Sequence, residues 1–411
     1  MSRAGTIAAI VDDSISQRAA SIRPSATFAM AARAATLRAQ GREIHDFSAG
    51  EPDFRPPTAV REATAAFVRE QPVRYTPVAG LPALREAVAT HLSAVHGSTI
   101  TPSRVLISCG AKHSIANLLQ ALLEPGDEVV IPTPAWVSYP DMVRLAGGVP
   151  VEVATTAADG FRLRPEALEA ALTPRTRALV LNSPGNPTGA GYDAAAVRAL
   201  GEVVARKAPR TWIMADDIYR RLTYGDFRHA SIVRTLADLH PRLAIVDGVS
   251  KTYAMTGYRI GYLVASEALV LGATRVQGQT TSGAATPSQH AALVALTDPT
   301  VDAEVDAMCL AFARRRDLML ARLAAIPDVH VPVPDGAFYV WMDVRAYLGR
   351  DPVPDDAELS RWLLEAHGVA TVPGGAFGGP GYIRLSYATA DAVIEAGCAR
   401  LVAAMAALRR G

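Results

Sequence analysis

Lysine is scarce in this chain of 411 residues. The 41 basic residues comprise 38 arginines and only three lysines, Lys112, Lys207 and Lys251. Because arginine serves wherever a surface cation is needed, the remaining lysines mark positions where chemistry beyond the reach of a guanidinium is expected. A Schiff base is such chemistry, since it needs a primary amine that loses its proton near neutral pH, as a desolvated lysine does and arginine does not.

Cysteine pairs, long apolar runs and an excess of one charge are also missing. Cys109, Cys309 and Cys398 form no C-x-x-C pair, so neither a disulfide framework nor a metal site is expected. No apolar run reaches the roughly 18 residues of a membrane span. The N-terminus lacks the basic start and apolar core of a signal peptide. A net charge of +1 with interspersed signs argues against nucleic-acid and membrane partners, and the expected location is the cytosol.

Regular apolar patterns are nevertheless abundant. Half of the chain is hydrophobic, enough for a large domain and a smaller one. Short apolar strands alternate with helices up to about residue 300, which is typical of a mostly parallel sheet covered on both faces. The expected strands there are 104–109, 128–132, 178–182, 212–216, 243–247 and 260–265. The expected helices are 58–67, with the Thr58 hydroxyl as its cap, 81–95, 110–125, 135–146, 193–207 and 267–279. An α+β pattern follows, with helices at 301–326, 356–365 and from 390, and strands at 329–333, 337–343, 369–373 and 382–387.

Four groups of polar residues lie at the ends of these strands, where open α/β sheets bind ligands. Asp216 ends one strand, and Lys251 follows another. The segment Asn182–Gly189 follows a third, and Gly110–Lys112 lies between a strand and a helix, where free amides and the helix dipole favour a phosphate. Taken singly, each has a simpler explanation, since an aspartate at a strand end is often a turn residue and Asn-Pro-Thr-Gly is a turn signal.

Together, these groups match the needs of one cofactor. An amine for a Schiff base, a carboxylate for a pyridinium nitrogen, and amides with a cation for a phosphate are what pyridoxal 5′-phosphate requires. The sequence therefore predicts this cofactor, attached to Lys251 and paired with Asp216.

With these residues the chain resembles the class I and II aminotransferases of fold type I, and within them the bacterial aspartate (aspartate/prephenate) aminotransferase subgroup. The matching segments extend over most of the chain and are 23–27, 49–54, 75–80, 136–139, 186–189, 216–219, 250–262, 336–339 and 384–388.

The resemblance implies an α/β fold with a mostly parallel, seven-stranded sheet in a large domain, residues 58–304. A smaller α+β domain is built from both chain ends, residues 23–57 and 305–411, after an N-terminal arm, residues 1–22. The implied reaction is a ping-pong transfer of an amino group between an L-amino acid and a 2-oxo acid. The implied assembly is a homodimer with shared active sites, in which Tyr75 reaches the neighbouring subunit's phosphate.

The resemblance also implies roles for single residues. Lys251 forms the Schiff base and moves the proton of the substrate's Cα, and Asp216 pairs with the pyridine nitrogen. Tyr219 bonds the phenolic oxygen of the ring with help from Asn186, and Trp136 stacks on the ring. The implied phosphate contacts are Ser250, Arg259, Tyr75 and the start of the helix at Gly110, with the backbone amides of Ala111 and Lys112.

The implied substrate contacts are Arg384, Asn186, Gly50, Lys112, Thr27 and Arg23. Arg384 takes the α-carboxylate through two parallel hydrogen bonds. Lys112 and Thr27 take the distal carboxylate of aspartate or glutamate, whose keto acids are oxaloacetate and 2-oxoglutarate. Arg23 matches a basic position of members that accept prephenate. Lys112 is alternatively an exposed first-turn residue, although a cation is unfavourable at a helix N-terminus.

Several positions depart from the usual family pattern: Ala111, His113, Asp217, Asp247, Gly248, Tyr258 and Gly283. Gly248 stands where many relatives carry a phosphate-binding hydroxyl, so one phosphate contact is expected to be missing. His113 and Gly283 lie close to the expected pocket and leave the substrate open. The alternatives are an aminotransferase for an unusual or aromatic amino acid in secondary metabolism and a lyase or synthase on the same fold. A regulator with an aminotransferase-like domain is disfavoured, because no helix-turn-helix segment precedes the domain.

Overall fold

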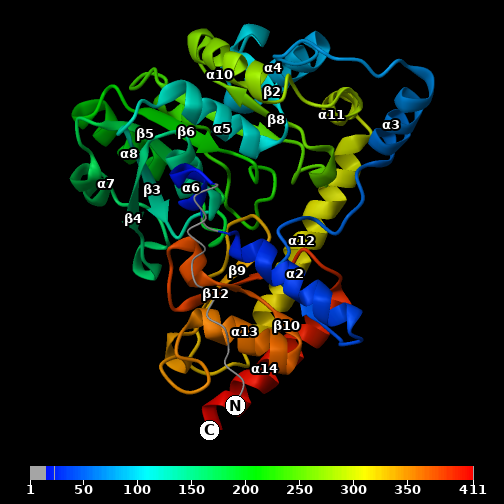
Figure 1. Ribbon diagram of the computed structural model, residues 1–411, viewed down its shortest axis with the longest axis vertical. Helices are drawn as coiled ribbons and strands as arrows, with labels where there is room; N and C mark the ends of the chain where they lie inside the picture. The colour runs from blue at the N-terminus through cyan, green and yellow to red at the C-terminus, as the bar shows by residue number, and fades with distance from the viewer. Residues whose placement is uncertain (1–14, 23, 411) are drawn as a thin grey trace.

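The computed structural model describes residues 15–22 and 24–410 (Figure 1). Arg23 and most of the expected N-terminal arm lie outside these residues. In Figure 1 a large sheet with its helices occupies the upper part and smaller sheets the lower part, and the long helix α12 (Val301–Leu323) runs from one to the other. No helix in the described ranges is long and apolar enough to cross a membrane.

The large sheet has seven strands in the order β2-β8-β7-β6-β5-β3-β4. Only β8 runs antiparallel to its neighbours β7 and β2, and the other pairs are parallel. The mostly parallel, seven-stranded α/β sheet is therefore confirmed. The strands are β2 (Val105–Ser108), β3 (Glu128–Thr133), β4 (Val149–Ala154), β5 (Thr176–Asn182), β6 (Trp212–Asp216), β7 (Leu243–Gly248) and β8 (Gly261–Val264).

Helices cover both faces of this sheet. Along β6, Ile213 and Ala215 pack in one buried cluster, while Met214 packs in another, because successive side chains of a strand point to opposite faces. The first cluster lies under α4 (Pro82–His96), α8 (Ala194–Lys207) and α11 (Thr286–Thr297). The second lies under α5 (Ala111–Leu122), α6 (Ser138–Leu145) and α10 (Glu267–Thr280). The other helices before α12 are α1 (Gln17–Ala20), α2 (Ala26–Ala39), α3 (Thr58–Glu70), α7 (Pro165–Ala171) and α9 (Ile232–Leu236).

Two smaller sheets join the two ends of the chain. β1 (His45–Asp46) pairs in parallel with β10 (Val369–Ala370), and the antiparallel sheet β11-β12-β9 contains β11 (Val372–Pro373), β12 (Tyr382–Ser386) and β9 (Tyr339–Asp343). They pack with α13 (Asp356–His367) and α14 (Asp391–Arg410). Along α12, Val301 and Val305 belong to the cluster of the large sheet, whereas Phe312 and Met319 belong to that of the smaller sheets. The exact division into domains stays a prediction.

Two local predictions are wrong. No continuous strand forms at 329–333, where only His330 makes a bridge, to Asp343. Pro332 and Pro334 explain this, because proline has no amide hydrogen to give to a ladder. Thr58 does not cap α3 but is its first helical residue, and its amide and hydroxyl donate to Glu304 at 2.9 and 3.4 Å.

Helix α12 offers a test of the core around the smaller sheets. Phe312 is fully buried against Phe54 and Phe338, with ring centroids 5.2 and 5.5 Å away. We expect Phe312→Ala to lower the free energy of unfolding by about 3–5 kcal/mol, because it leaves a cavity. Leu310 on the same helix is 71% exposed, so Leu310→Ala should change the free energy by at most about 0.5 kcal/mol. Urea denaturation at one protein concentration measures both, and equal losses would contradict this assignment of the core.

Candidate active site

Three neighbouring parallel strands end at one edge of the large sheet and bring the predicted residues together. Asn182, at the end of β5, lies opposite Asp216, at the end of β6. Lys251 follows the next strand, β7, by three residues. Because parallel strands present their carboxyl ends at the same edge, these side chains gather where such sheets bind ligands.

The amine of Lys251 lies in this region with little access to water. Its Nζ donates to the carbonyl oxygen of Gly50 at 2.6 Å and lies 5.8 Å from the ring centroid of Phe338. Loss of hydration lowers the pKa of Lys251 to about 8, partly opposed by the nearby carboxylate of Glu51. An appreciable fraction of the amine is therefore neutral, and nucleophilic, close to physiological pH.

Asp216 and Asp217 face opposite sides of the sheet, as expected for adjacent residues in extended chain. Oδ2 of Asp216 accepts a hydrogen bond of 2.6 Å from the hydroxyl of Tyr139, on α6. Asp217 instead lies 3.3 Å from Nε2 of His229. Burial raises the pKa of Asp216 to about 7 against the opposing hydrogen bonds from Tyr139 and Ile218.

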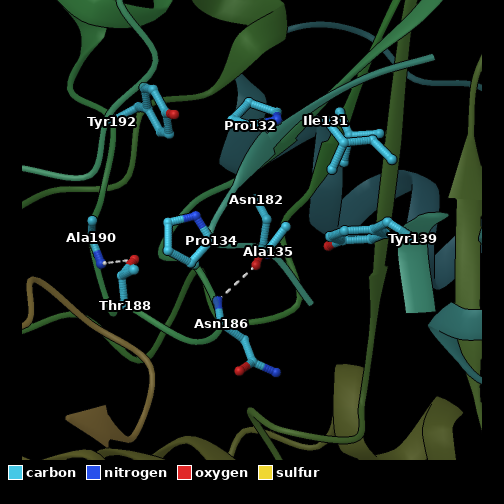
Figure 2. Close-up of a pocket in the computed structure, with 12 residues that line it drawn as sticks. Ile131, Pro132, Pro134, Ala135, Tyr139, Asn182, Asn186, Thr188, Ala190 and Tyr192 are labelled. Carbon is cyan, nitrogen blue, oxygen red and sulfur yellow. Dashed lines mark hydrogen bonds between the residues drawn. The ribbon is translucent and has the colours of Figure 1, made fainter. Parts of the chain in front are cut away.

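The loop after β5 is held in place by its own polar groups. Nδ2 of Asn182 donates to the backbone oxygen of Asp216 at 2.9 Å, and its Oδ1 accepts from the amide of Asn186 at 2.9 Å. Figure 2 shows this contact at the rim of a pocket that Tyr139 also lines. The side chain of Asn186 points onward, and its Oδ1 accepts from Arg384 at 3.0 Å.

Arg384 is a buried cation on β12, only 1% exposed. Its Nη1 donates to Asn186, its Nη2 donates to the carbonyl oxygen of Ser48 at 2.8 Å, and its Nε is buried without a partner. The guanidinium carbon lies 4.3 Å from the ring centroid of Tyr339. Burial lowers the pKa of Arg384. A buried guanidinium with an unused donor and no ion-pair partner among the described residues suits an anionic ligand.

Two buried tyrosines meet between the sheets. The hydroxyls of Tyr219, after β6, and Tyr339, on β9, are 2.9 Å apart, and the rings pack edge to face. Burial raises the pKa of the Tyr219 hydroxyl well above its usual value, so the group remains a hydrogen-bond donor. The site therefore draws on the large sheet and on the smaller ones.

The N-terminus of α5 forms a cradle that only glycine permits. Gly110 has φ +86°, and a Cβ there would lie 2.5 Å from Nη2 of Arg259. A Cβ on Gly261 would lie 2.1 Å from the amide nitrogen of Ala111. Arg259 itself is held at φ +57°, a strained conformation for a residue with a side chain. A guanidinium beside the first amides of a helix is an arrangement that binds phosphate, and buried Ser250 precedes Lys251 in the same region.

Four further predicted residues are half-buried or exposed. Nζ of Lys112 stands 4.8 Å from the ring centroid of half-buried Trp136. Partial desolvation and the neighbouring Arg259 lower the pKa of Lys112. Thr27 is half-buried on α2. Tyr75 is 96% exposed, so it is free to contact another molecule.

The sequence interpretation missed Tyr139, Tyr339 and Ser48 as members of this site. Tyr139 and Tyr339 stand inside segments of the family resemblance, at 136–139 and 336–339, and this was the one available signal. Ser48 contributes a backbone oxygen, for which side-chain patterns carry no information.

The missing phosphate contact at Gly248 stays a prediction, and the structure shows why glycine stands there. A Cβ at this position would lie 2.8 Å from the carbonyl oxygen of Ile260 and 2.9 Å from Cα of Gly261. The close approach of β7 and β8 therefore requires glycine here, whatever binds nearby. Two of the other departures have ordinary partners: Asp247 pairs with buried Arg220 at 2.6 Å, and the ring nitrogen Nδ1 of His113 accepts from the amide of Cys109 at 3.3 Å.

These groups fit pyridoxal 5′-phosphate. The cofactor needs an amine of lowered pKa, a buried carboxylate for its ring nitrogen and a cation beside free amides for its phosphate. Lys251, Asp216 and Arg259 with the start of α5 supply these features at one sheet edge.

Comparisons with known proteins agree with this arrangement. The family described as Aminotransferase class I and II matches residues 42–401. The chain is 42% identical over 399 residues to the aspartate/prephenate aminotransferase of Cereibacter sphaeroides, covering 96% of this chain and 99% of that protein. It is 40% identical to the aspartate aminotransferase of Geobacillus stearothermophilus, covering 94% and 98% of the two chains.

Solved structures show the same fold. The aspartate aminotransferase of Thermus thermophilus with maleate superposes with a TM-score of 0.89 at 40% identity, covering 95% of this chain and 99% of that one. The aspartate aminotransferase of Rhizobium meliloti gives a TM-score of 0.91 at 39% identity, covering 95% and 98%. The chain therefore belongs to the class I and II aminotransferase family, and it is a fold type I aminotransferase that depends on pyridoxal 5′-phosphate.

Proposed function

We propose that this aminotransferase exchanges amino groups between aspartate or glutamate and the keto acids oxaloacetate and 2-oxoglutarate, with prephenate as a further acceptor. One observation carries the proposal: besides Lys251 and Arg259, which are assigned to the cofactor, the site holds two cations, Arg384 and Lys112, and neither has a carboxylate within 4.0 Å among the described residues. Two such cations suit a substrate with two carboxylates. Relatives of about 40% identity are named aspartate and aspartate/prephenate aminotransferases.

The cofactor supplies an electrophilic carbonyl and an electron-withdrawing ring, which take up the amino group and make the Cα proton acidic. Asp216 is proposed to hold a proton on the ring nitrogen, and Tyr219 and Asn186 to donate to the ring oxygen. Trp136 covers the ring. The phosphate is assigned to Arg259, to Ser250 and to the start of α5 at Gly110, with the backbone amides of Ala111 and Lys112; the side chain of Lys112 is left for the substrate.

The substrate is proposed to be held at both ends. Arg384 takes the α-carboxylate, and the hydrogen bonds to Asn186 and Ser48 already fix the plane of its guanidinium. Lys112 and Thr27 take the distal carboxylate. Lys251 then moves the proton from Cα, a task for which an amine of pKa about 8 is well matched near neutral pH.

A homodimer with shared active sites belongs to the same proposal. The extended segment between α3 and α4 carries Tyr75, 96% exposed, and Val73, 55% exposed. Exposure of a large aromatic and a valine on one extended segment favours burial against a second subunit. In that arrangement Tyr75 reaches the phosphate bound by the partner. A cytosolic location stays a prediction.

Lysine scarcity gives a direct test of the cofactor attachment. We expect borohydride to fix the cofactor on Lys251 alone, and capture of the cofactor by cofactor-free protein to accelerate as pH rises through about 8, as the amine becomes neutral. Peptide mapping and stopped-flow absorbance measure the two effects. Lys251→Ala should lose amino transfer by several orders of magnitude. Lys207, which pairs with Glu169 at 2.8 Å, provides the control, and an adduct on Lys207 or Lys112 would overturn the assignment.

The two adjacent aspartates are distinguished by paired substitutions. Asp216→Ala should lose most activity and Asp216→Glu should keep some, because the ring nitrogen needs a carboxylate partner to stay protonated. Asp217→Asn should keep most turnover but lower stability, since Asp217 faces His229 on the other side of the sheet. Steady-state kinetics and thermal denaturation measure these effects. Unchanged turnover in Asp216→Ala would mean that Asp217 faces the ring.

The dicarboxylate preference depends on Lys112. Lys112→Ala should lower kcat/KM for aspartate about ten- to a hundredfold, since a charge-assisted contact contributes roughly 1.5–3 kcal/mol. It keeps the backbone amide at the start of α5, so alanine and phenylalanine should react almost as before. Half-reactions followed by cofactor absorbance measure these rates. Equal losses for acidic and neutral amino acids would assign Lys112 to the phosphate and leave the amino-acid preference open.

A further inference from the structure

A buried tyrosine stands behind the carboxylate that is proposed to face the ring nitrogen. The hydroxyl of Tyr139 donates to Oδ2 of Asp216 at 2.6 Å, and the two residues are only 2% and 3% exposed. The ring of Tyr139 meets that of Trp136 edge to face, with centroids 5.3 Å apart. Tyr139 is therefore fixed on both sides, by a hydrogen bond at its hydroxyl and by packing at its ring.

Two other buried carboxylates make the ionised form of Asp216 costly. Burial, Asp217 and Asp247 all raise the pKa of Asp216, whereas the hydrogen bonds from Tyr139 and from the amide of Ile218 lower it, that of Tyr139 more. On the sheet face opposite to Asp216, His229 compensates the charge of Asp217 and Arg220 compensates that of Asp247. Among the described residues, Tyr139 is therefore the one side chain that donates a hydrogen bond to Asp216.

The remaining titratable groups near Asp216 act less directly. Lys251 and Tyr219 interact with it through their charges or dipoles, without a direct hydrogen bond. Burial and the neighbouring carboxylate raise the pKa of Tyr139 well above its usual value. Its phenol consequently stays protonated and remains a donor over the whole working pH range.

We propose that Tyr139 is a positioning residue that keeps Asp216 ionised and thereby keeps the shared proton on the cofactor's ring nitrogen. A carboxylate that accepts a hydrogen bond is a weaker base than one that does not, so the proton shared with the ring lies closer to nitrogen. The inference rests on the proposed place of the ring nitrogen at Asp216. The same bond fixes the carboxyl plane, because Oδ2 is held by Tyr139 while Oδ1 accepts from Ile218 at 3.3 Å.

A purely structural role for Tyr139 makes different predictions, and Tyr192 provides the matched control. Both tyrosines are buried and line the same pocket (Figure 2). The hydroxyl of Tyr192 accepts from the amide of Leu163 at 2.8 Å, away from Asp216. Tyr139→Phe and Tyr192→Phe thus each remove one buried hydroxyl from the pocket, but only the first removes a donor to Asp216.

The first measurement uses cofactor-free protein labelled with ¹³C at the aspartate carboxyls. Infrared difference spectra against Asp216→Asn follow the protonation of this one carboxyl. We expect Tyr139→Phe to move its midpoint upward by about one to two pH units, and Tyr192→Phe to leave it unchanged. An unchanged midpoint in Tyr139→Phe, or an equal shift in Tyr192→Phe, would overturn the proposal.

The second measurement uses enzyme loaded with cofactor that carries ¹⁵N in the ring. In Tyr139→Phe the nitrogen resonance should move toward that of the unprotonated ring, and kcat should fall more than KM for aspartate changes. If Tyr139→Phe does not fold, 3-fluorotyrosine at position 139 replaces it. This residue has nearly the same volume and a more acidic phenol, so the Asp216 midpoint should move downward, and a midpoint that stays or rises contradicts the proposal.

Failure of the proposed function gives a separate result. Full amino transfer by Asp216→Asn would mean that the ring nitrogen does not pair with Asp216. The infrared shift in Tyr139→Phe would still be observed in that case. If the infrared shift appears but the ¹⁵N resonance does not move, Tyr139 affects the protonation of Asp216 without affecting that of the ring nitrogen. The part of the proposal that concerns the ring nitrogen is then overturned.

Discussion

The structure depends on charged groups that are held away from water at one edge of a parallel sheet. Asp216 and Arg384 are 3% and 1% exposed, and desolvation lowers the pKa of Lys251 to about 8. Burial of such groups costs several kcal/mol each unless hydrogen bonds compensate. The carbonyl oxygens of Ser48 and Gly50, the side-chain oxygen of Asn186 and the phenol of Tyr139 give that compensation in part. What remains uncompensated, above all at Arg384, is available to a ligand.

The sheet topology decides which residues can meet there. Reversal of one strand, β8, brings Gly261 against the start of α5 and places Arg259 beside Gly110. Only glycine fits where the chain segments approach so closely, and this approach brings Arg259 beside the start of α5, where the phosphate is proposed to bind. The strained φ of Arg259 lies in the same turn. The close packing of β2, β8 and α5 therefore also forms the proposed phosphate site.

Much of this was predictable, because it follows from local patterns. Continuous apolar strands located β5, β6 and β7, and the polar residues after them located Asn182, Asp216 and Lys251. The edge strand β4 was missed since none of its residues is buried and they include Pro150 and Glu152, so it lacks a buried strand's apolar run. Strand 329–333 was wrongly predicted from its valines. Tyr139 in the site was not foreseen, because its partner lies 77 residues away and a tyrosine on an apolar helix face reads as core.

Successive side chains of a strand point to opposite faces of the sheet, and this explains why polar side chains form two layers near the site. Asp216 shares its face with Met214 and meets Tyr139 of α6, while Asp217 and Asp247 turn to the opposite face, where His229 and Arg220 compensate them. Asp217 and Asp247 add negative charge close to Asp216, and this charge by itself would favour the protonated form of Asp216. The hydrogen bond from Tyr139, together with the weaker one from the amide of Ile218, opposes this effect. With the ring nitrogen at Asp216 as proposed, the ring chemistry depends on a balance between three buried carboxylates and the phenol of Tyr139, which favours ionisation of one of them.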